Sequence, residues 1–396
     1  MSKLAIDGGT PVREKYLAYG RQSIDDKDIE AVVELLKGDF LTTGPTVSEF
    51  ENKVAEFVGA RYGVAVSNGT AALHMACHAA GIGPGDEVLV PAITFAASSN
   101  CVLYCGGTPV FVDIDPKTYN IDVNKIEEKI TENTKAIIPV DFSGQAVDMD
   151  KILEIAHKHN LIVIEDSAHA LGSEYKNRKV GTKAHMTEFS FHPVKPVTTA
   201  EGGIIVTDDE KLYEKMMLFR SHGITRNKEL MDEDHGPWYY EQVDLGYNYR
   251  LTDLQCALGI SQMDKLDSFI ARRREIVSKY NEAFSELEEI NTPFEEEFSN
   301  SGWHIYVITL NLDKLAVGRK EVFEALQKEN IGVNVHYLPV YLHPYYKGLG
   351  YEKGLCPVAE DIYNRMITLP LFPAMTENDV QDVITAVKKV INAYRR

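Results

Sequence analysis

The sequence predicts an α/β fold in two parts: a large domain over residues 1–250, which includes an N-terminal arm, and a smaller α+β domain over residues 251–396. In the first part short apolar runs alternate with helical patterns, which is typical of a mainly parallel sheet covered by helices on both faces. In the second part the pattern changes to charged helices around a strand-like run. A chain of 396 residues with 44% hydrophobic and 25% charged residues can bury cores of this kind.

The elements of the large domain follow in order from these runs. A strand at "YGVAVS" precedes a helix at about residues 70–80, and a strand at "DEVLVP" precedes a helix at about residues 95–104. Further strands are predicted at "PVFVDID", "KAIIPVD", "LIVIED", "EFSFH" and "GGIIVTD", with a helix at "DMDKILEIAHKHN". In a parallel sheet of this kind, ligands bind beyond the carboxyl ends of the strands, so those ends are where chemistry is expected.

The small domain is predicted from four runs. A long charged helix covers "MDKLDSFIARRREIVSKYNEAFSEL", and a strand follows at "WHIYVITLNL". Two more helices are predicted, at "RKEVFEALQKEN" and after "MTENDV". Mixed helices and strands without regular alternation are typical of an α+β unit.

Charge and hydropathy narrow the class of protein. The 41 Lys and Arg against 59 Asp and Glu give a net charge of −18, which argues against nucleic acid as a partner. The start "MSKLAIDGGTPVREKY" lacks the apolar stretch of a signal peptide. Residues 88–112 carry no charge, but Pro91 and Pro109 interrupt them, so a buried crossing of the core is favoured over a membrane span. We expect a cytoplasmic protein that does not bind membranes.

Cysteine and histidine spacing does not indicate a metal site. The cysteines at positions 77, 101, 105, 256 and 356 show no CxxC pair, so they are expected to be small buried residues in a reducing compartment. His336 and His343 lie seven residues apart in a proline-broken segment without an HExxH motif. No metal is therefore expected.

A first candidate site lies at "SNGTAAL", between a strand and a helix. The free amides and the dipole at the start of a helix suit a phosphate group, which Ser67, Gly69 and Thr70 would surround. The same residues also suit an ordinary helix cap, with Asn68 or Thr70 as the capping residue. The motif alone leaves both interpretations open.

Two further candidates follow the next strands. In "LIVIEDSAHA" a buried strand ends at Asp166, three residues before His169. A carboxylate in that position either caps the next helix or binds the protonated nitrogen of a ligand, because a buried charge needs a partner. Phe95 in "TFAAS" is predicted to open a helix, where its ring belongs either to the core or to the face of a cofactor.

The fourth candidate is Lys195 in "SFHPVKPVTTAEGG". Pro193 and Pro196 lack an amide donor and have fixed φ angles, so this stretch is predicted to be a rigid connection rather than a helix or central strand. The lysine is therefore held in place instead of moving freely in solvent.

In this order, a phosphate seat, an aromatic residue, a strand-end carboxylate and a constrained lysine resemble the fold type I aminotransferases that use pyridoxal 5′-phosphate (PLP). The resemblance narrows to the DegT/DnrJ/EryC1/StrS family of sugar aminotransferases and covers nearly the whole chain. It rests on the motifs "LTTGPTVSEFE", "SNGTAAL", "TFAASSN", "EDSAHALGS", "KPVTTAEGG", "RSHGI", "LGYNYRLTDLQCALG", "WHIYVI", "VHYLPV" and "LPLFPAMT". Within the family, "FSFHPVKP" and "DFSGQ" are most similar to members that act at C4 of a UDP-linked 4-keto-6-deoxy-N-acetyl-hexosamine in pseudaminic acid synthesis.

The resemblance implies a role for each candidate. Lys195 would bind the cofactor covalently and move a proton to and from the substrate carbon, while Asp166 would pair with the pyridine nitrogen. At about 4 Å and an effective dielectric constant near 20, that ion pair is worth about 4 kcal/mol, enough to keep the nitrogen protonated. The other implied cofactor-binding residues are Gly69, Thr70, Ala71, Phe95, His169, Ser190 and, from the facing subunit of a homodimer, Asn248.

For the substrates, the resemblance implies a sugar nucleotide as acceptor and glutamate as the amino donor. His336, Tyr337 and Tyr345 would line the sugar-nucleotide cleft, and Arg250 would bind the glutamate carboxylate. Three alternatives stay open: action at C3 of a dTDP-linked keto sugar, a dehydratase, and a non-catalytic binding or regulatory relative. Some relatives carry histidine at the lysine position and dehydrate the sugar, but here Lys195 occupies it and His192 lies three residues earlier, which favours transamination.

Overall fold

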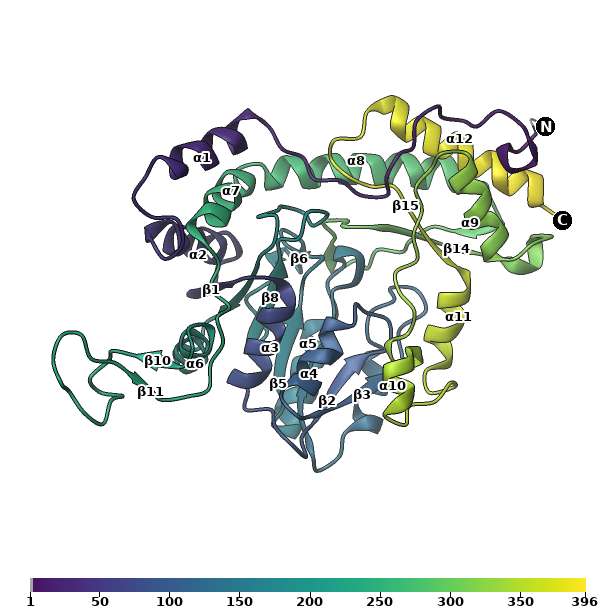
Figure 1. Ribbon diagram of the computed structural model, residues 1–396. Coiled ribbons are helices and arrows are strands. Elements are labelled where there is room, and N and C mark those ends of the chain that lie inside the picture. The colour runs from purple at the N-terminus through teal and green to yellow at the C-terminus, as the bar shows by residue number, and fades with distance from the viewer. Residues whose placement is uncertain (1–2) are drawn as a thin grey trace.

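The computed structural model describes residues 3–396, and a sheet of seven strands lies at the centre of this part of the chain (Figure 1). The strands run in the order β1-β9-β8-β5-β4-β2-β3, in which β1 and β9 are antiparallel to their neighbours and all other pairs are parallel. This confirms the predicted mainly parallel sheet. The strands are β1 (Tyr62–Val66), β2 (Glu87–Pro91), β3 (Thr108–Val112), β4 (Thr134–Ile137), β5 (Ile162–Asp166), β8 (Met186–Ser190) and β9 (Gly203–Thr207).

Helices cover both faces of this sheet. On one face the core includes side chains of α3 (Gly69–Ala79), α4 (Ala97–Tyr104) and α6 (Glu210–Arg220). On the other face it includes side chains of α2 (Pro45–Val58), α5 (Met149–His159) and α7 (Asp253–Met263). The apolar strand runs seen in the sequence are therefore buried on two sides, as parallel strands require.

The helix predicted to begin at Phe95 begins two residues later, at Ala97. The hydroxyl of Thr94 lies 2.6 Å from that of Ser98, and Ser98 donates its amide to the carbonyl of Phe95, so residues 94–96 form a bend before the helix. Phe95 is therefore outside the helix, and 60% of its surface is exposed.

The C-terminal part contains an antiparallel sheet of β12 (Ile290–Asn291), β14 (Tyr306–Leu310) and β15 (Met366–Leu369). It packs with α8 (Leu266–Phe284), α9 (Arg319–Lys328) and α12 (Glu377–Tyr394) around a second core. Leu4 and Leu17 of the N-terminal arm join this core, so the arm lies close to the C-terminal helix α12 (Figure 1). The predicted division into domains at residue 250 stays a prediction. The first two residues of the predicted large domain lie outside the described part of the chain.

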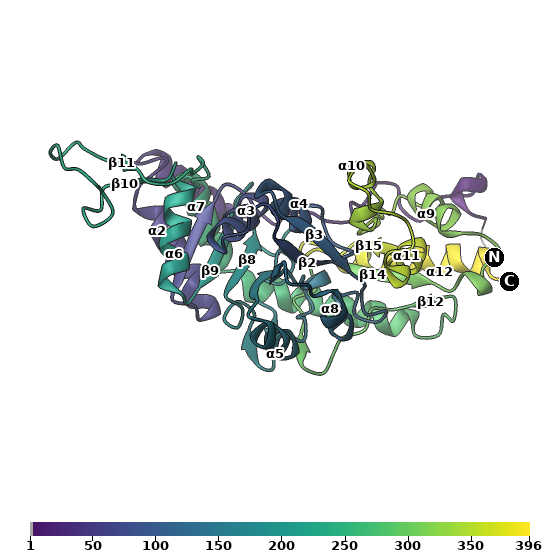
Figure 2. The same ribbon diagram turned by 90° about the horizontal axis from the view of Figure 1, so that it is seen from below.

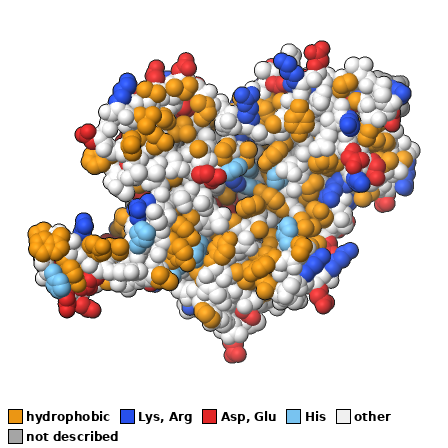
Figure 3. Space-filling model, viewed as in Figure 1, with side chains coloured by type: hydrophobic (Ala, Val, Ile, Leu, Met, Phe, Trp, Pro, Cys, Tyr) orange, Lys and Arg blue, Asp and Glu red, His pale blue; other side chains and the backbone are white. Residues whose placement is uncertain are grey.

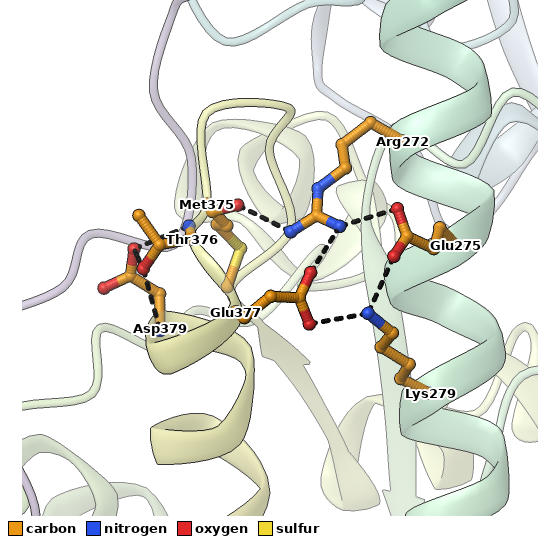
Figure 4. A network of polar contacts seen from close by, with 7 residues as sticks. All are labelled: Arg272, Glu275, Lys279, Met375, Thr376, Glu377 and Asp379. Atoms are coloured by element: carbon orange, nitrogen blue, oxygen red, sulfur yellow. Dashed lines mark hydrogen bonds and ion pairs between the residues drawn. The ribbon is translucent and has the colours of Figure 1, made fainter.

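Ion pairs fasten α8 to the start of α12 (Figure 4). Arg272 and Lys279 of α8 both contact the carboxylate of Glu377, at 2.8 and 2.6 Å, and Arg272 also donates to the carbonyl of Met375 at 2.7 Å. The hydroxyl of Thr376 caps α12 by accepting from the amide of Asp379. The cap defines where the last helix begins.

The remaining elements lie around these bodies. A loop with β10 (Ile224–Thr225) and β11 (Glu241–Gln242) projects from one end of the molecule (Figures 1 and 2). The other elements are α1 (Asp26–Leu36), α10 (Pro344–Gly348), α11 (Pro357–Arg365), β6 (Glu174–Tyr175), β7 (Arg178–Lys179), β13 (Ser299–Asn300) and the 3₁₀ helices Ala5–Asp7, Val123–Lys125, Glu127–Lys129, Phe142–Gly144, Leu312–Lys314 and Val340–Leu342. Within residues 3–396, no helix combines the length and the apolar character needed to cross a membrane.

Candidate active site

Lys195 lies in the connection between β8 and β9, and hydrogen bonds hold this connection in place. The amide of Lys195 donates to the carbonyl of His192 at 2.9 Å, and the carbonyl of Phe191 accepts from the amide of Thr199 and the hydroxyl of Thr198, both at 3.0 Å. Burial lowers the pKa of the Lys195 amine to about 8, although the nearby carboxyls of Glu188 and Asp166 oppose this shift. A fraction of the amine is therefore unprotonated near neutral pH and can act as a nucleophile or base.

Asp166 ends β5 and is 5% exposed. Its Oδ2 accepts from the hydroxyl of Ser98 at 2.6 Å, and its Oδ1 accepts from the amide of Ala168 at 3.2 Å. Two donors thus support the ionised carboxylate at the end of a buried strand. Asp166 therefore remains the candidate counter-charge for the protonated nitrogen of a ligand.

His169 is a buried neutral base beside these groups. Its Nδ1 accepts from the amide of Ser143 at 3.2 Å, which leaves the ring proton on Nε2, 3.4 Å from the hydroxyl oxygen of Tyr337. Burial lowers the pKa of His169 well below its usual value, and the charge of Lys195 adds to this effect. The ring of His304 lies 4.4 Å away. His169 therefore offers a neutral N–H donor.

The first turn of α3 and the hydroxyl of Ser190, at the end of β8, form a candidate phosphate-binding site, the phosphate seat. The side chain of Asn68 caps the helix by accepting from the amide of Ala71 at 2.8 Å. The amides of Gly69 and Thr70 come first in the helix and have no carbonyl within it to bond. A Cβ atom on Gly69 would lie 3.2 Å from the hydroxyl of Ser190, so the glycine keeps the backbone close to that hydroxyl. Both predicted features, the helix cap and free amides, are present. In this structure the Ala71 amide serves the cap.

Aromatic rings border the same region. The exposed ring of Phe95 lies 6.1 Å from that of Tyr337, which in turn contacts His169. His336 is 6% exposed, and its Nδ1 lies 2.8 Å from the hydroxyl of Thr368. Burial lowers the pKa of His336 to about 4, with the charge of Lys195 contributing. His336 thus lies close to the lysine, while Tyr337 lies close to His169 and Asp166.

Tyr345, Asn248 and Arg250 complete the set of predicted residues. Tyr345 of α10 is 66% exposed, and its ring packs 5.8 Å from that of Tyr346. Asn248 is exposed and pairs with Ser221, while the backbone of Arg250 pairs with Val66 at the end of β1. Figure 3 shows a hollow near the middle of this face, where histidine side chains lie beside acidic and basic ones.

Sequence reasoning missed several groups that support the site. Ser98 follows Phe95 by three residues in "TFAASS", and this spacing on the opening turn of a helix could have indicated it. Ser143 and His304 come from other segments, so no local pattern marks them. Among residues 3–396 no group of His, Cys, Asp or Glu is arranged to hold a metal.

Comparisons with known proteins identify relatives of the whole chain. The model of the DegT/DnrJ/EryC1/StrS aminotransferase family matches residues 22–388. The spore coat polysaccharide biosynthesis protein SpsC of Bacillus subtilis is 43% identical over 96% of this chain and 98% of its own length. A Campylobacter jejuni UDP-4-amino-4,6-dideoxy-N-acetyl-beta-L-altrosamine transaminase is 39% identical over 96% of this chain and 99% of its own. The structure of Helicobacter pylori PseC, an aminotransferase of pseudaminic acid biosynthesis, aligns with a TM-score of 0.89 at 34% identity, covering 96% and 100% of the two chains.

Proposed function

The chain belongs to the DegT/DnrJ/EryC1/StrS aminotransferase family and is a PLP-dependent aminotransferase; we propose that it moves an amino group from glutamate to C4 of a UDP-linked 4-keto-6-deoxy-N-acetyl-hexosamine. The observation that supports this most is the pairing of a constrained Lys195 with a buried Asp166, in a chain that is 39% identical to a transaminase named for a UDP-linked 4-amino-4,6-dideoxy-N-acetyl sugar. Free thiols at all five cysteines fit the cytoplasm, the location that we also propose.

The residues present fit PLP. The Gly69 and Thr70 amides and the Ser190 hydroxyl surround a seat suited to a phosphate, and the start of α3 favours negative charge there. Asp166 is buried and held by two donors, and among residues 3–396 it has no ion pair with a lysine or arginine, so it suits the pyridine nitrogen. Lys195 has the lowered pKa that a covalent anchor needs.

When bound, PLP supplies an electron sink that stabilises negative charge on the carbon that loses a proton. The protein's own groups do the remaining work. The Lys195 amine takes the proton from the donor's carbon and returns one to the sugar carbon, and its pKa of about 8 suits both directions near neutral pH. The carboxylate of Asp166 would hold a proton on the pyridine nitrogen of bound PLP, and the Nε2–H of His169 would donate a hydrogen bond to the cofactor's phenolic oxygen.

The substrates would bind on the exposed side of this arrangement. We assign the face of Phe95 to the cofactor ring, Tyr337, His336 and Tyr345 to the sugar nucleotide, and Arg250 to the glutamate carboxylate. In support, Phe95 and Tyr345 present exposed rings, as an aromatic binding surface requires. Arg250 has no ion-pair partner among residues 3–396, so its charge is available.

We further propose that the working unit is a homodimer in which Asn248 reaches the phosphate seat of the partner subunit. Asn248 is exposed and ends a projecting loop that carries Trp238 and Leu245, which are 72% and 70% exposed. Apolar surface of this kind is seldom left open to water. A neutral amide can donate to a phosphate dianion without adding like charge.

The test is to offer the purified enzyme several keto-sugar nucleotides with glutamate and to identify the products by NMR. Amination at C4 of the UDP-linked substrate, with release of 2-oxoglutarate, is expected. Amination at C3 of a dTDP-linked keto sugar would instead support the alternative substrate, and loss of the sugar hydroxyl without nitrogen transfer would contradict transamination altogether.

A further inference from the structure

Glu188 is a buried carboxyl group beside the candidate active site that the reaction described above does not use. It lies on β8 and is fully buried, with 0% exposure. Among residues 3–396 neither of its carboxyl oxygens has a hydrogen-bond partner. An ionised carboxylate without donors is costly to bury, so the group needs a physical explanation.

The register of the sheet places Glu188 next to Asp166. The two residues are direct partners across the parallel pair β5 and β8. A Cβ atom on Gly69 would lie 2.4 Å from Oε1 of Glu188, so this carboxyl packs against the first residue of α3. Ser190, two residues along β8 and hence on the same face, borders the same glycine. Glu188 thus lies between Asp166 and the phosphate seat.

Two adjacent carboxylates are both hydrogen-bond acceptors, so they can bond to each other only through a proton. Asp166 already accepts from Ser98 and Ala168, which stabilise its ionised form. Glu188 has no such donors, so the proton belongs on Glu188. Burial and the charge of Asp166 raise the pKa of Glu188 well above its usual range, while Lys195 opposes the shift and the thiol of Cys101 adds to it.

We propose that Glu188 is a positioning residue that stays protonated, donates its O–H to Asp166, and so orients that carboxylate without placing a second negative charge beside the cofactor phosphate. An ionised Glu188 would repel both the phosphate and Asp166. This inference rests on the family's PLP site and not on the identity of the sugar, so its test needs no sugar substrate.

The first measurement is infrared difference spectroscopy of the cofactor-free protein, wild type against Glu188→Gln. A band from a protonated carboxylic acid should be present in the wild type and missing in the variant. Glu165→Gln is the matched control, because Glu165 is also buried, at 3% exposure, but accepts from the hydroxyl of Thr187 on the opposite face of the sheet. Glu165→Gln should lose only the band of Glu165 and should keep the band that is assigned to Glu188.

The second measurement is the PLP dissociation constant by equilibrium dialysis from pH 7 to pH 10. Glu188→Gln, which stays neutral and can donate, should bind PLP as tightly as the wild type at pH 7 and more tightly at high pH, where Glu188 ionises. Glu188→Ala removes the donor and should weaken binding about tenfold, whereas Glu165→Gln should leave it unchanged.

Two results would overturn the proposal. The first is an infrared spectrum in which Glu188→Gln removes only a carboxylate band. The second is equal PLP binding by Glu188→Ala, Glu188→Gln and wild type at every pH. If Glu188→Ala does not fold, the isosteric Glu188→Gln variant decides the question by itself through its infrared band and its pH profile.

Discussion

At the scale of single residues, the chemistry depends on which of two adjacent acids faces the site. Glu165 and Asp166 end the same strand, and successive side chains of a strand point to opposite faces. Glu165 accepts from the hydroxyl of Thr187 and influences Asp141, whereas Asp166 lies with Lys195 and Ser98. Only Asp166 therefore lies on the side of the sheet where we propose that the cofactor binds.

Replacing Lys195 by alanine should abolish transamination, because the connection between β8 and β9 contains no other primary amine. PLP should still bind through the remaining residues of the site. Borohydride treatment followed by peptide mass spectrometry should find the cofactor attached to Lys195 in the wild type alone. In cofactor-free wild type, the rate of attachment should rise with pH through about 8, since the amine must lose its proton first. Wild-type turnover by Lys195→Ala would refute the assignment.

Asp166→Asn should lower turnover more than a hundredfold, since about 4 kcal/mol of support for the ring nitrogen's proton is lost. Ser98→Ala, which removes one donor to Asp166, should cause a smaller loss in steady-state kinetics. Both variants should keep the wild-type circular dichroism spectrum. Equal rates for Asp166→Asn and wild type would leave Asp166 with a purely structural role.

At the scale of elements, one buried acid holds α1 on α7. Asp28 is 1% exposed and accepts from the side chains of Ser261 and Gln262, at 2.7 and 2.8 Å, and pairs with Lys265. By contrast, the network between α8 and α12 is largely exposed: Glu377 keeps 63% of its side-chain surface in solvent (Figure 4). Burial, rather than the number of ion pairs, decides which contact contributes more to the free energy of unfolding.

Asp28→Ala should therefore lower the free energy of unfolding by about 1–3 kcal/mol, because Ser261 and Gln262 lose a buried hydrogen-bond acceptor, while Lys265 keeps its ion pair with Asp25. Glu377→Gln should shift the urea midpoint much less, and added salt should shrink its effect further. Urea denaturation of both variants at low and high salt tests this order. The reverse order would show that the exposed network matters more than the buried acid.

At the scale of the whole molecule, buried neutral histidines make stability depend on pH. Burial lowers the pKa of His74 to about 4 in the folded chain, against 6.5 for an ordinary histidine. Below pH 6.5 the unfolded chain therefore binds a proton that folded His74 does not, and stability is lost as the pH falls from 6.5 towards 4. His336, His169 and His304 act in the same direction.

The melting temperature should accordingly fall between pH 6.5 and pH 4, and calorimetry across this range measures the slope. His74→Phe keeps an aromatic ring among Tyr104, Phe219 and Tyr247 but cannot titrate, so its slope should be shallower. An unchanged slope would mean that His74 does not contribute to the pH dependence.

Subunit mixing tests the shared site. Lys195→Ala and Asn248→Asp homodimers should each be poor enzymes, the second because aspartate places a like charge beside the phosphate. If Asn248 serves the partner's site, each mixed dimer contains one site with both defects and one with neither, so activity should reappear on mixing. If Asn248 serves its own subunit, every site keeps one defect, and exchanged subunits would stay inactive.

Local patterns in the sequence were sufficient for the seven strands of the central sheet, for β14 and for the helices α3, α4, α5, α8, α9 and α12. They also singled out Lys195 and the strand-end Asp166, whose roles stay predictions. Each depends on properties of neighbouring residues: apolar runs, proline positions and residues at strand ends. The late start of α4 was missed because a hydroxyl pair between Thr94 and Ser98 bends the chain ahead of the helix. The binding roles of Tyr337, Tyr345, Asn248 and Arg250 stay predictions.

Only the tertiary structure decided which distant groups meet. The register between β5 and β8 brings Glu188 beside Asp166, and no spacing in the sequence encodes that register. Ser143 reaches His169, and Leu4 and Leu17 join the C-terminal core, through contacts between segments far apart in the chain. Patterns of period 2 and 3.6 specify which face of an element is apolar, whereas the alignment of one element with another results from packing across the whole core.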